Sequence, residues 1–175
     1  MVRARRAQHL LVKTPDKAAV VAALISEMER ALDVMVQAAK IAHTAATHEE
    51  MKPENDKDTR GIEAGYLAKG QSVRAAEIER SLRELRALPV RAFGKDDAVI
   101  AGALVVTEDT DTEARAHVFI APAGGGVKLA LGGVSVQVVT PSSPLGDALM
   151  GKRAGDPVEL LVGGKKRELE IVEVT

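Results

Sequence analysis

Five carboxylates lie close together in the first half of the chain. They are Glu49, Glu50, Glu54, Asp56 and Asp58. Like charges crowded in this way repel one another, so the cluster does not help the chain to fold. Carboxylates on a protruding turn are instead available to another molecule, and the chemistry that suits them is contact with a metal ion held by a partner.

The elements that must position this cluster are two long, alanine-rich helical patterns, one on each side of it. Thr14, Pro15 and Asp16 indicate a helix start, with Thr14 as N-cap, Pro15 at the first helical position and Asp16 favoured by the helix dipole. We expect this helix to run to about His48. Its apolar positions recur at steps of three and four residues, as in a coiled-coil seam. They are Val21, Leu24, Met28, Ala31, Met35, Ala38, Ala42 and Ala45.

The return helix is expected to start between Asp56 and Thr59 and to end near Leu88. Its predicted apolar positions are Ile62, Tyr66, Val73, Ala76, Leu82, Leu85 and Leu88. Three glycines fall inside it, where each costs about 1 kcal/mol relative to Ala. We therefore expect Gly61, Gly65 and Gly70 to mark close helix contact or local flexibility.

Pro53 is the only helix breaker between the two patterns. Helices of this length must fold back on each other to bury their apolar stripes, so the bend falls at Pro53. The sequence thus predicts an antiparallel coiled-coil hairpin over residues 14–88, with the acidic tip at residues 48–58.

The remainder of the chain has the pattern of β-structure. The β-rich runs are residues 98–107, 116–121, 127–131, 134–140, 157–162 and 166–174, and glycine turns separate several of them. Ser143 followed by Pro144 predicts the start of a short helix, and Gly151 its end. We expect an α+β unit in which this helix packs on an antiparallel sheet of about five strands.

Composition excludes several classes of protein. The formal net charge of −1 gives no general attraction to a polyanion, so DNA is not an expected partner. The absence of Cys excludes disulfides and thiolate metal sites and favours the cytoplasm. No apolar run approaches the ~18 residues of a membrane span, and the apolar stretch after the basic start is too short for a signal peptide.

Other constellations are weaker. His43 and His48 are five residues apart and lack the four-residue spacing of a helical metal-binding pair. The glycine run 124–126 lacks the Lys and Ser or Thr of a phosphate-binding loop. The basic residues Arg3, Arg5 and Arg6 have the character of a frayed terminus. No pair of a nucleophile and a base indicates a self-contained hydrolase.

Two segments give the chain a family resemblance. Residues 140–156, TPSSPLGDALMGKRAGD, resemble the C-terminal signature of the Gre family of bacterial transcription elongation factors. In that signature Ser-Pro opens a short helix, Gly closes it and Gly-Asp follows; Thr140 stands where the family usually has Ser. Residues 50–55, EMKPEN, are similar to the family's tip, although Glu50 replaces Asp and Pro53 is an insertion.

The resemblance implies a two-part fold and a partner. It implies that the hairpin enters the secondary channel of RNA polymerase while an FKBP-like C-terminal domain, residues 89–175, grips the channel rim. The tip carboxylates, here Glu50 and Glu54 with Asp56 nearby, would then help to hold Mg²⁺ in the polymerase's own active centre, and backtracked RNA is cut near its 3′ end. No cofactor is expected on the protein alone, which would act as an accessory factor rather than as an enzyme.

The short helix is expected to shape the polymerase-docking surface, with Ser143, Pro144, Leu145 and Lys152 as partner-binding residues and Leu149 facing the sheet. Residues 1–13 form an N-terminal extension in this scheme. Two alternatives stay open. The protein is a Gre-like regulator that occupies the channel without cleavage, or it is a coiled-coil interaction module for an unrelated partner.

Overall fold

The computed structural model describes residues 14–47, 60–94 and 96–175. The chain divides into two compact units. The sheet unit comprises Met1–Leu24 with Glu84–Thr175, and the helical unit comprises Ile25–Arg83. No helix in the described ranges has the length and apolar character to cross a membrane.

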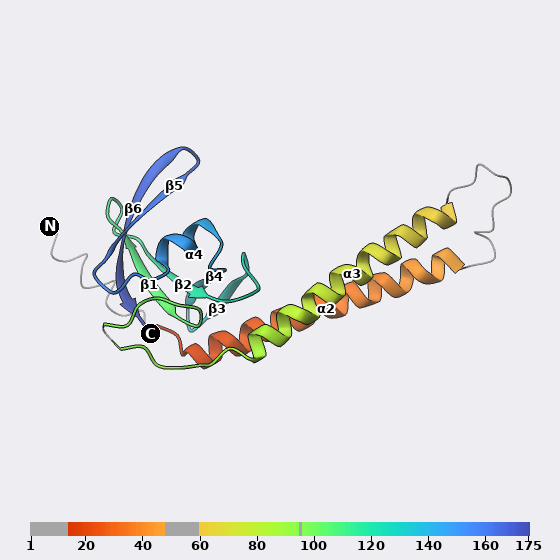
Figure 1. The fold of residues 1–175 in the computed structure, drawn as a ribbon, viewed down its shortest axis with the longest axis horizontal. Coiled ribbons are helices and arrows are strands. Elements are labelled where there is room, and N and C mark those ends of the chain that lie inside the picture. The colour runs from red at the N-terminus through yellow and green to blue at the C-terminus, as the bar shows by residue number, and fades with distance from the viewer. Residues whose placement is uncertain (1–13, 48–59, 95) are drawn as a thin grey trace. The chain divides into compact units, whose positions relative to one another are not determined.

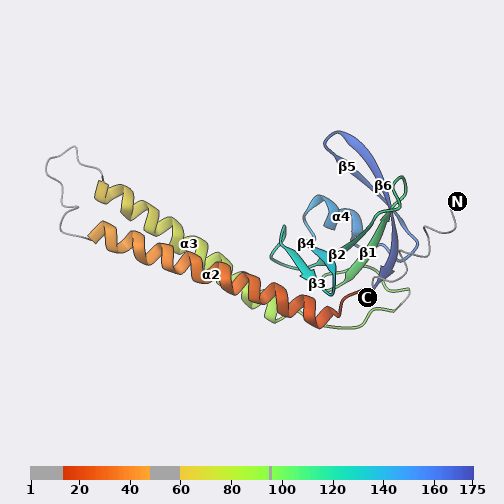
Figure 2. The same ribbon diagram turned by 180° about the vertical axis from the view of Figure 1, so that it is seen from behind.

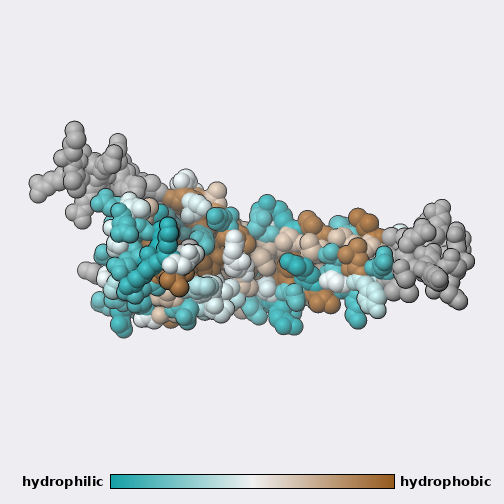
Figure 3. Space-filling view, turned by 90° about the horizontal axis from the view of Figure 1, so that it is seen from above, coloured by the Kyte–Doolittle hydropathy of each residue, from teal (hydrophilic) through white to brown (hydrophobic). Residues whose placement is uncertain are grey.

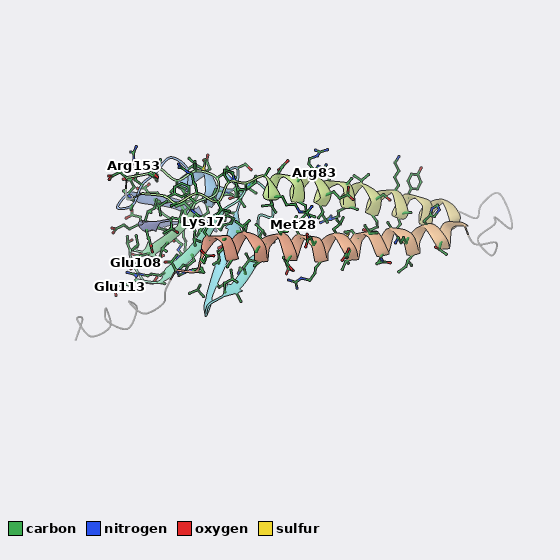
Figure 4. The ribbon with its side chains drawn as sticks, turned by 90° about the horizontal axis from the view of Figure 1, so that it is seen from below. Lys17, Met28, Arg83, Glu108, Glu113 and Arg153 are labelled. Atoms are coloured by element: carbon green, nitrogen blue, oxygen red, sulfur yellow. The ribbon has the colours of Figure 1, made fainter. Side chains whose placement is uncertain are left out.

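Two helices build the helical unit, as the sequence predicted. Helix α2 spans Lys17–Thr47 and helix α3 spans Arg60–Arg86, and within this unit they run side by side in opposite directions (Figures 1 and 4). The predicted seam of α2 is confirmed from Val21 to Ala42, because Val21, Leu24 and Ala42 are buried while Met28 and Met35 are half-buried. The side chain of Ala45 lies outside those described.

The seam of α3 differs from the prediction. The shielded positions continue at steps of three and four residues through Ala68, Gln71, Ala75, Ile78, Leu82 and Leu85. The predictions for Leu82 and Leu85 are therefore confirmed. Tyr66 is 73% exposed, Val73 is 54% exposed and Ala76 is exposed as well, so the predicted place of these three in the seam was wrong. Their size suggested burial, but the register of the helix shields other positions, small ones such as Ala68 and large ones such as Leu82. Apolar groups accordingly appear on the surface of this unit in Figure 3.

The glycines of α3 do not mark close contact. A Cβ built on Gly65 or Gly70 would have no neighbouring heavy atom within 4 Å. The expectation of a tight helix contact at these two positions was therefore wrong. The side chains of residues 60–62 lie outside those described.

Helix α2 begins two residues later than expected. Asp16, not Thr14, is its N-cap, because the Asp16 carboxylate accepts a hydrogen bond from the backbone N–H of Ala19 at 3.0 Å and its carbonyl accepts from Val20 N–H at 3.0 Å. The Thr14 hydroxyl donates instead to Glu173 Oε2 at 2.8 Å. Lys17 thus opens the helix, as labelled in Figure 4.

The sheet unit contains one mixed sheet of six strands among the described residues. The strands are β1 Leu104–Asp109, β2 Arg115–Ile120, β3 Lys128–Leu131, β4 Val134–Val139, β5 Pro157–Val162 and β6 Lys165–Val174. Their spatial order is β3-β4-β2-β1-β6-β5. Figure 2 shows the same arrangement from behind.

The prediction of a purely antiparallel sheet of about five strands was wrong. β2 and β4 are parallel, with His117 opposite Val136, while the other neighbouring strands are antiparallel. The chain makes the β3–β4 hairpin after β2, and this extra reversal brings β4 back in the direction of β2. Alternation of apolar residues predicts strands, but it does not encode the path between them.

An aliphatic core supports the short helix α4, Pro144–Leu149. Leu149 is fully buried in one cluster with Val118, Val139, Val158 and Ile171. The sequence prediction of a short helix packed on a sheet is therefore confirmed. β2 is buried over residues 117–120 on both of its faces, as expected of a strand near the middle of a sheet.

Candidate functional site

The predicted tip carboxylates lie outside the described residues. Glu50, Glu54 and Asp56 fall between the last residue of α2, Thr47, and the first residue of α3, Arg60. Their proposed role in holding Mg²⁺ stays a prediction. Within the described ranges, no group of three or more His, Asp or Glu side chains is placed to hold a metal ion.

The predicted docking segment begins at a well-formed helix start. Ser143 is extended, with φ −73° and ψ 154°, and its hydroxyl oxygen accepts a hydrogen bond from Gly146 N–H at 3.1 Å. The same hydroxyl donates to the carbonyl of Thr140 at 2.7 Å. Pro144 follows at the first helical position, where its missing N–H is not needed. The Ser-Pro pair therefore acts as the sequence predicted.

The end of α4 is tied to the segment before β1. Gly151 has φ 76°, in the left-handed region that favours glycine after a helix. Its N–H donates to Val99 carbonyl at 2.8 Å, and Val99 N–H donates to Lys152 carbonyl at 2.7 Å. This pair of bonds ties Val99 to the segment after α4, and a turn follows in which Ala103 N–H donates to the Ile100 carbonyl at 3.1 Å. Residues 98–103, expected as part of the first strand, are therefore irregular, and β1 begins only at Leu104.

The four predicted docking residues separate into two places. Ser143, Pro144 and Leu145 gather at the start of α4, where Pro144 is exposed and Leu145 is partly buried against the core. Lys152 follows the other end of the helix and is half-buried. The structure thus brings three of these residues together, and their contact with a partner stays a prediction.

A cavity of about 820 Å³ lies beside the start of α4. Pro144 and Leu145 form part of its wall, and strand residues such as Val118 and Leu160 form much of the rest. Its charged lining residues are Asp109, Arg115 and Arg167. Its polar lining residues include Thr107, Gln137, Thr140 and Ser143.

Asp109 and Arg167 form the most strongly connected polar group of this cavity. Arg167 Nε donates to Asp109 Oδ2 at 3.1 Å, and Nη2 donates to the same oxygen. Asp109 Oδ1 accepts from Thr112 N–H at 2.9 Å and from the Thr112 hydroxyl at 2.8 Å. The hydrogen bonds from Arg167, followed by those from Thr112, hold the pKa of Asp109 well below its usual range.

Sequence analysis did not find this pair. Asp109 and Arg167 are 58 residues apart and belong to different strands, β1 and β6. Each sits in a run of mixed charged and apolar residues that marks only a strand. The register between β1 and β6, which places Asp109 opposite Leu169, brings them together.

Comparison with known proteins gives a family for the C-terminal part. Residues 94–175 match the family model described as transcription elongation factor, GreA/GreB, C-terminal. A search of curated proteins found no match. The matched residues include the segment 140–156, on which the sequence resemblance rests.

This chain is also similar to solved structures that are described as Gfh1 or GreA/GreB factors. Gfh1 (GreA factor homolog 1) of Thermus thermophilus is 24% identical over 86% of this chain and 94% of that chain, with a TM-score of 0.37. Gfh1 of Thermus aquaticus is 23% identical over 86% and 90%, with a TM-score of 0.39. A GreA/GreB factor from Nitrosomonas europaea is 20% identical over 56% and 78%, with a TM-score of 0.37.

The match over residues 94–175 contains the Ser-Pro start of α4. The sheet with its short helix occupies the same residues as that match. Residues 94–175 of this chain therefore belong to the GreA/GreB family of transcription elongation factors.

Proposed function

We propose that this protein binds bacterial RNA polymerase in the cytoplasm and stimulates cleavage of backtracked RNA. The observation that carries the proposal is the match of residues 94–175 to the GreA/GreB C-terminal domain, preceded in the chain by a helical hairpin. The order of these two parts is that of the family that the sequence resembles.

The C-terminal domain would supply the docking surface on the rim of the secondary channel. The start of α4 supports this role, because Pro144 is exposed there beside the 820 Å³ cavity. Leu161, also a lining residue, is 76% exposed. Apolar side chains exposed around a concave surface are suited to receive a protein partner.

The hairpin would carry the acids to the reaction. The 31 residues of α2 correspond to about 46 Å of helix at 1.5 Å per residue, which is a length suited to entering a channel. Glu50 and Glu54, with Asp56 nearby, would help to hold Mg²⁺ at the polymerase's active centre, and they would act on the RNA 3′ end only through that centre. The protein itself would be an accessory factor.

Stalled, backtracked elongation complexes test this function. Addition of the protein should shorten the RNA from its 3′ end, and Glu50→Ala or Glu54→Ala should abolish the shortening while leaving polymerase binding intact. Glu77→Ala is a matched control, because Glu77 is an exposed acid of α3 away from the tip. Cleavage by both tip variants at the parent rate would remove the metal-holding role.

A second function has a specific observation in its favour. Glu50 stands where the family has Asp, and Pro53 adds a residue to the tip. Catalytic geometry is sensitive to displacements of about 1 Å, so these two departures favour a regulator that occupies the channel without cleavage. In the same assay such a protein would bind the polymerase and slow nucleotide addition, and the RNA would keep its length.

A further inference from the structure

A second cavity, of about 550 Å³, lies within the sheet unit at the start of α2. Its wall includes Lys17 from the first turn of α2 and Val90, Arg91 and Phe93 from the segment before the sheet. Neither the docking surface proposed above nor the hairpin tip uses any of these residues. The cavity is large enough for a small molecule.

Two cations share one aromatic ring in this cavity. The ammonium nitrogen of Lys17 lies 4.4 Å from the centre of the Phe93 ring, and the guanidinium carbon of Arg91 lies 4.3 Å from it. Lys17 Nζ also donates a hydrogen bond to the backbone carbonyl of Arg91. These contacts fix both cations beside the same cavity.

Neither cation forms an ion pair within the described part of the chain. The ammonium group of Lys17 has three donors, and one of them donates to the Arg91 carbonyl. The five donors of the Arg91 guanidinium have no acceptor among the described residues. The pKa of Lys17 is lowered, first by burial and then by the positive charge of Arg91. An acid close to Lys17 would act in the opposite direction.

Two acids also line the cavity, but each is engaged elsewhere. The Asp16 carboxylate caps α2 through Ala19 N–H at 3.0 Å, and Glu173 Oε2 accepts from the Thr14 hydroxyl at 2.8 Å. Glu173 also acts on His117. Burial lowers the pKa of His117, and the negative charge of Glu173 opposes this shift. The lining thus holds two cations and two acids, but among the described residues neither acid forms an ion pair with Lys17 or Arg91.

We propose that this cavity binds a small phosphorylated ligand, with a phosphoryl group held between Lys17 and Arg91. A phosphoryl group carries several acceptor oxygens and so can take the free donors of both side chains at once, and it relieves the repulsion between the two cations. The exposed side chain of Val90, at 51% exposure, offers an apolar contact to the rest of the ligand. This site is separate from the proposed polymerase function and does not depend on it.

Calorimetric titration of the full chain with inorganic pyrophosphate at low salt tests the proposal. We expect saturable binding of one pyrophosphate per chain that weakens as salt is added. Lys17→Gln and Arg91→Gln should each weaken binding by about tenfold or more, because hydrogen bonds between charged groups are lost. Lys128→Gln, at an exposed position of β3, is the matched control and should bind like the parent.

Titrations with other ligands distinguish the possible sources of the phosphoryl group. Tighter binding of a nucleoside diphosphate than of pyrophosphate would identify a nucleotide, and equal binding would identify the free anion; both outcomes support the site. No saturable binding, equal weakening by Lys128→Gln, or preference for citrate or an acidic peptide would overturn it. Circular dichroism and melting of each variant establish that a loss of binding does not come from a loss of fold.

Discussion

Gly146 lies directly against the backbone of Thr140. A Cβ built on Gly146 would be 1.9 Å from the Thr140 carbonyl oxygen and 2.9 Å from its carbonyl carbon. The same carbonyl accepts the hydrogen bonds of Ser143 N–H, at 3.0 Å, and of the Ser143 hydroxyl, at 2.7 Å. The glycine of the Ser-Pro-Leu-Gly segment is therefore required by the tight turn that starts α4.

Gly146→Ala should destabilise the sheet unit. The added methyl group has to displace backbone rather than a flexible side chain, and overpacking of this kind typically costs 1–3 kcal/mol or more. Faster hydrogen exchange over residues 94–175 would show the effect. Gly94→Ala is the control, since a Cβ there would meet only Asp97 Oδ2, at 3.8 Å. Equal exchange in both variants would mean that the turn relaxes freely.

Leu149→Ala should also lower the stability of the sheet unit, through a cavity. Leu149 is fully buried in the main aliphatic cluster, and removal of such a side chain typically costs 2–5 kcal/mol. If α4 shapes the docking surface, polymerase binding should weaken together with stability.

Lys152→Ala separates packing from docking. Lys152 is half-buried beyond the end of α4, and its described contacts with Val99 and Leu149 are made by its backbone. Urea unfolding of this variant should therefore match the parent, while a polymerase pull-down should report any role of its charge. A fall in stability as large as that of Leu149→Ala would contradict this assignment of α4.

The helical unit offers a stabilising substitution. Gly70 lies inside α3 with open space where a Cβ would be, and Ala is favoured over Gly in a helix by about 1 kcal/mol. Gly70→Ala should slow hydrogen exchange over residues 60–86. Faster exchange in Gly70→Ala would contradict this prediction and would show that α3 needs the conformational freedom of glycine at this position.

Local features of this fold could be predicted from the sequence, whereas non-local ones could not. The Ser143 cap and the end of α4 at Gly151 depend on neighbours within a few residues, and both were predicted correctly. The parallel pairing of β2 with β4 and the meeting of Asp109 with Arg167 depend on the path of the chain between strands, which leaves no local pattern. The seam of α3 was predicted correctly at Leu82 and Leu85 but misplaced at Tyr66 and Val73, because these two were judged by size while register decided burial.

The low pKa of Asp109 predicts a stability that depends on pH. Because Arg167 and Thr112 stabilise the charged carboxylate in the folded state, its pKa is lower there than in the unfolded chain. Its contribution is therefore complete above the ordinary aspartate pKa of about 3.9 and is lost as the pH falls through the lower, folded value. Asp109→Asn keeps the shape of the side chain but removes this titration.

Urea unfolding of the parent and of Asp109→Asn across a pH series measures this effect. The parent should be the more stable of the two near pH 7, and the difference should shrink steadily once the pH falls below about 4. Arg167→Gln should reproduce the loss at neutral pH, because it removes the first cause of the shift. Asp111→Asn controls for net charge, since Asp111 is an exposed acid of the same turn. A difference that stays constant from pH 7 to pH 3 would show that Asp109 acts through its shape and not through its charge.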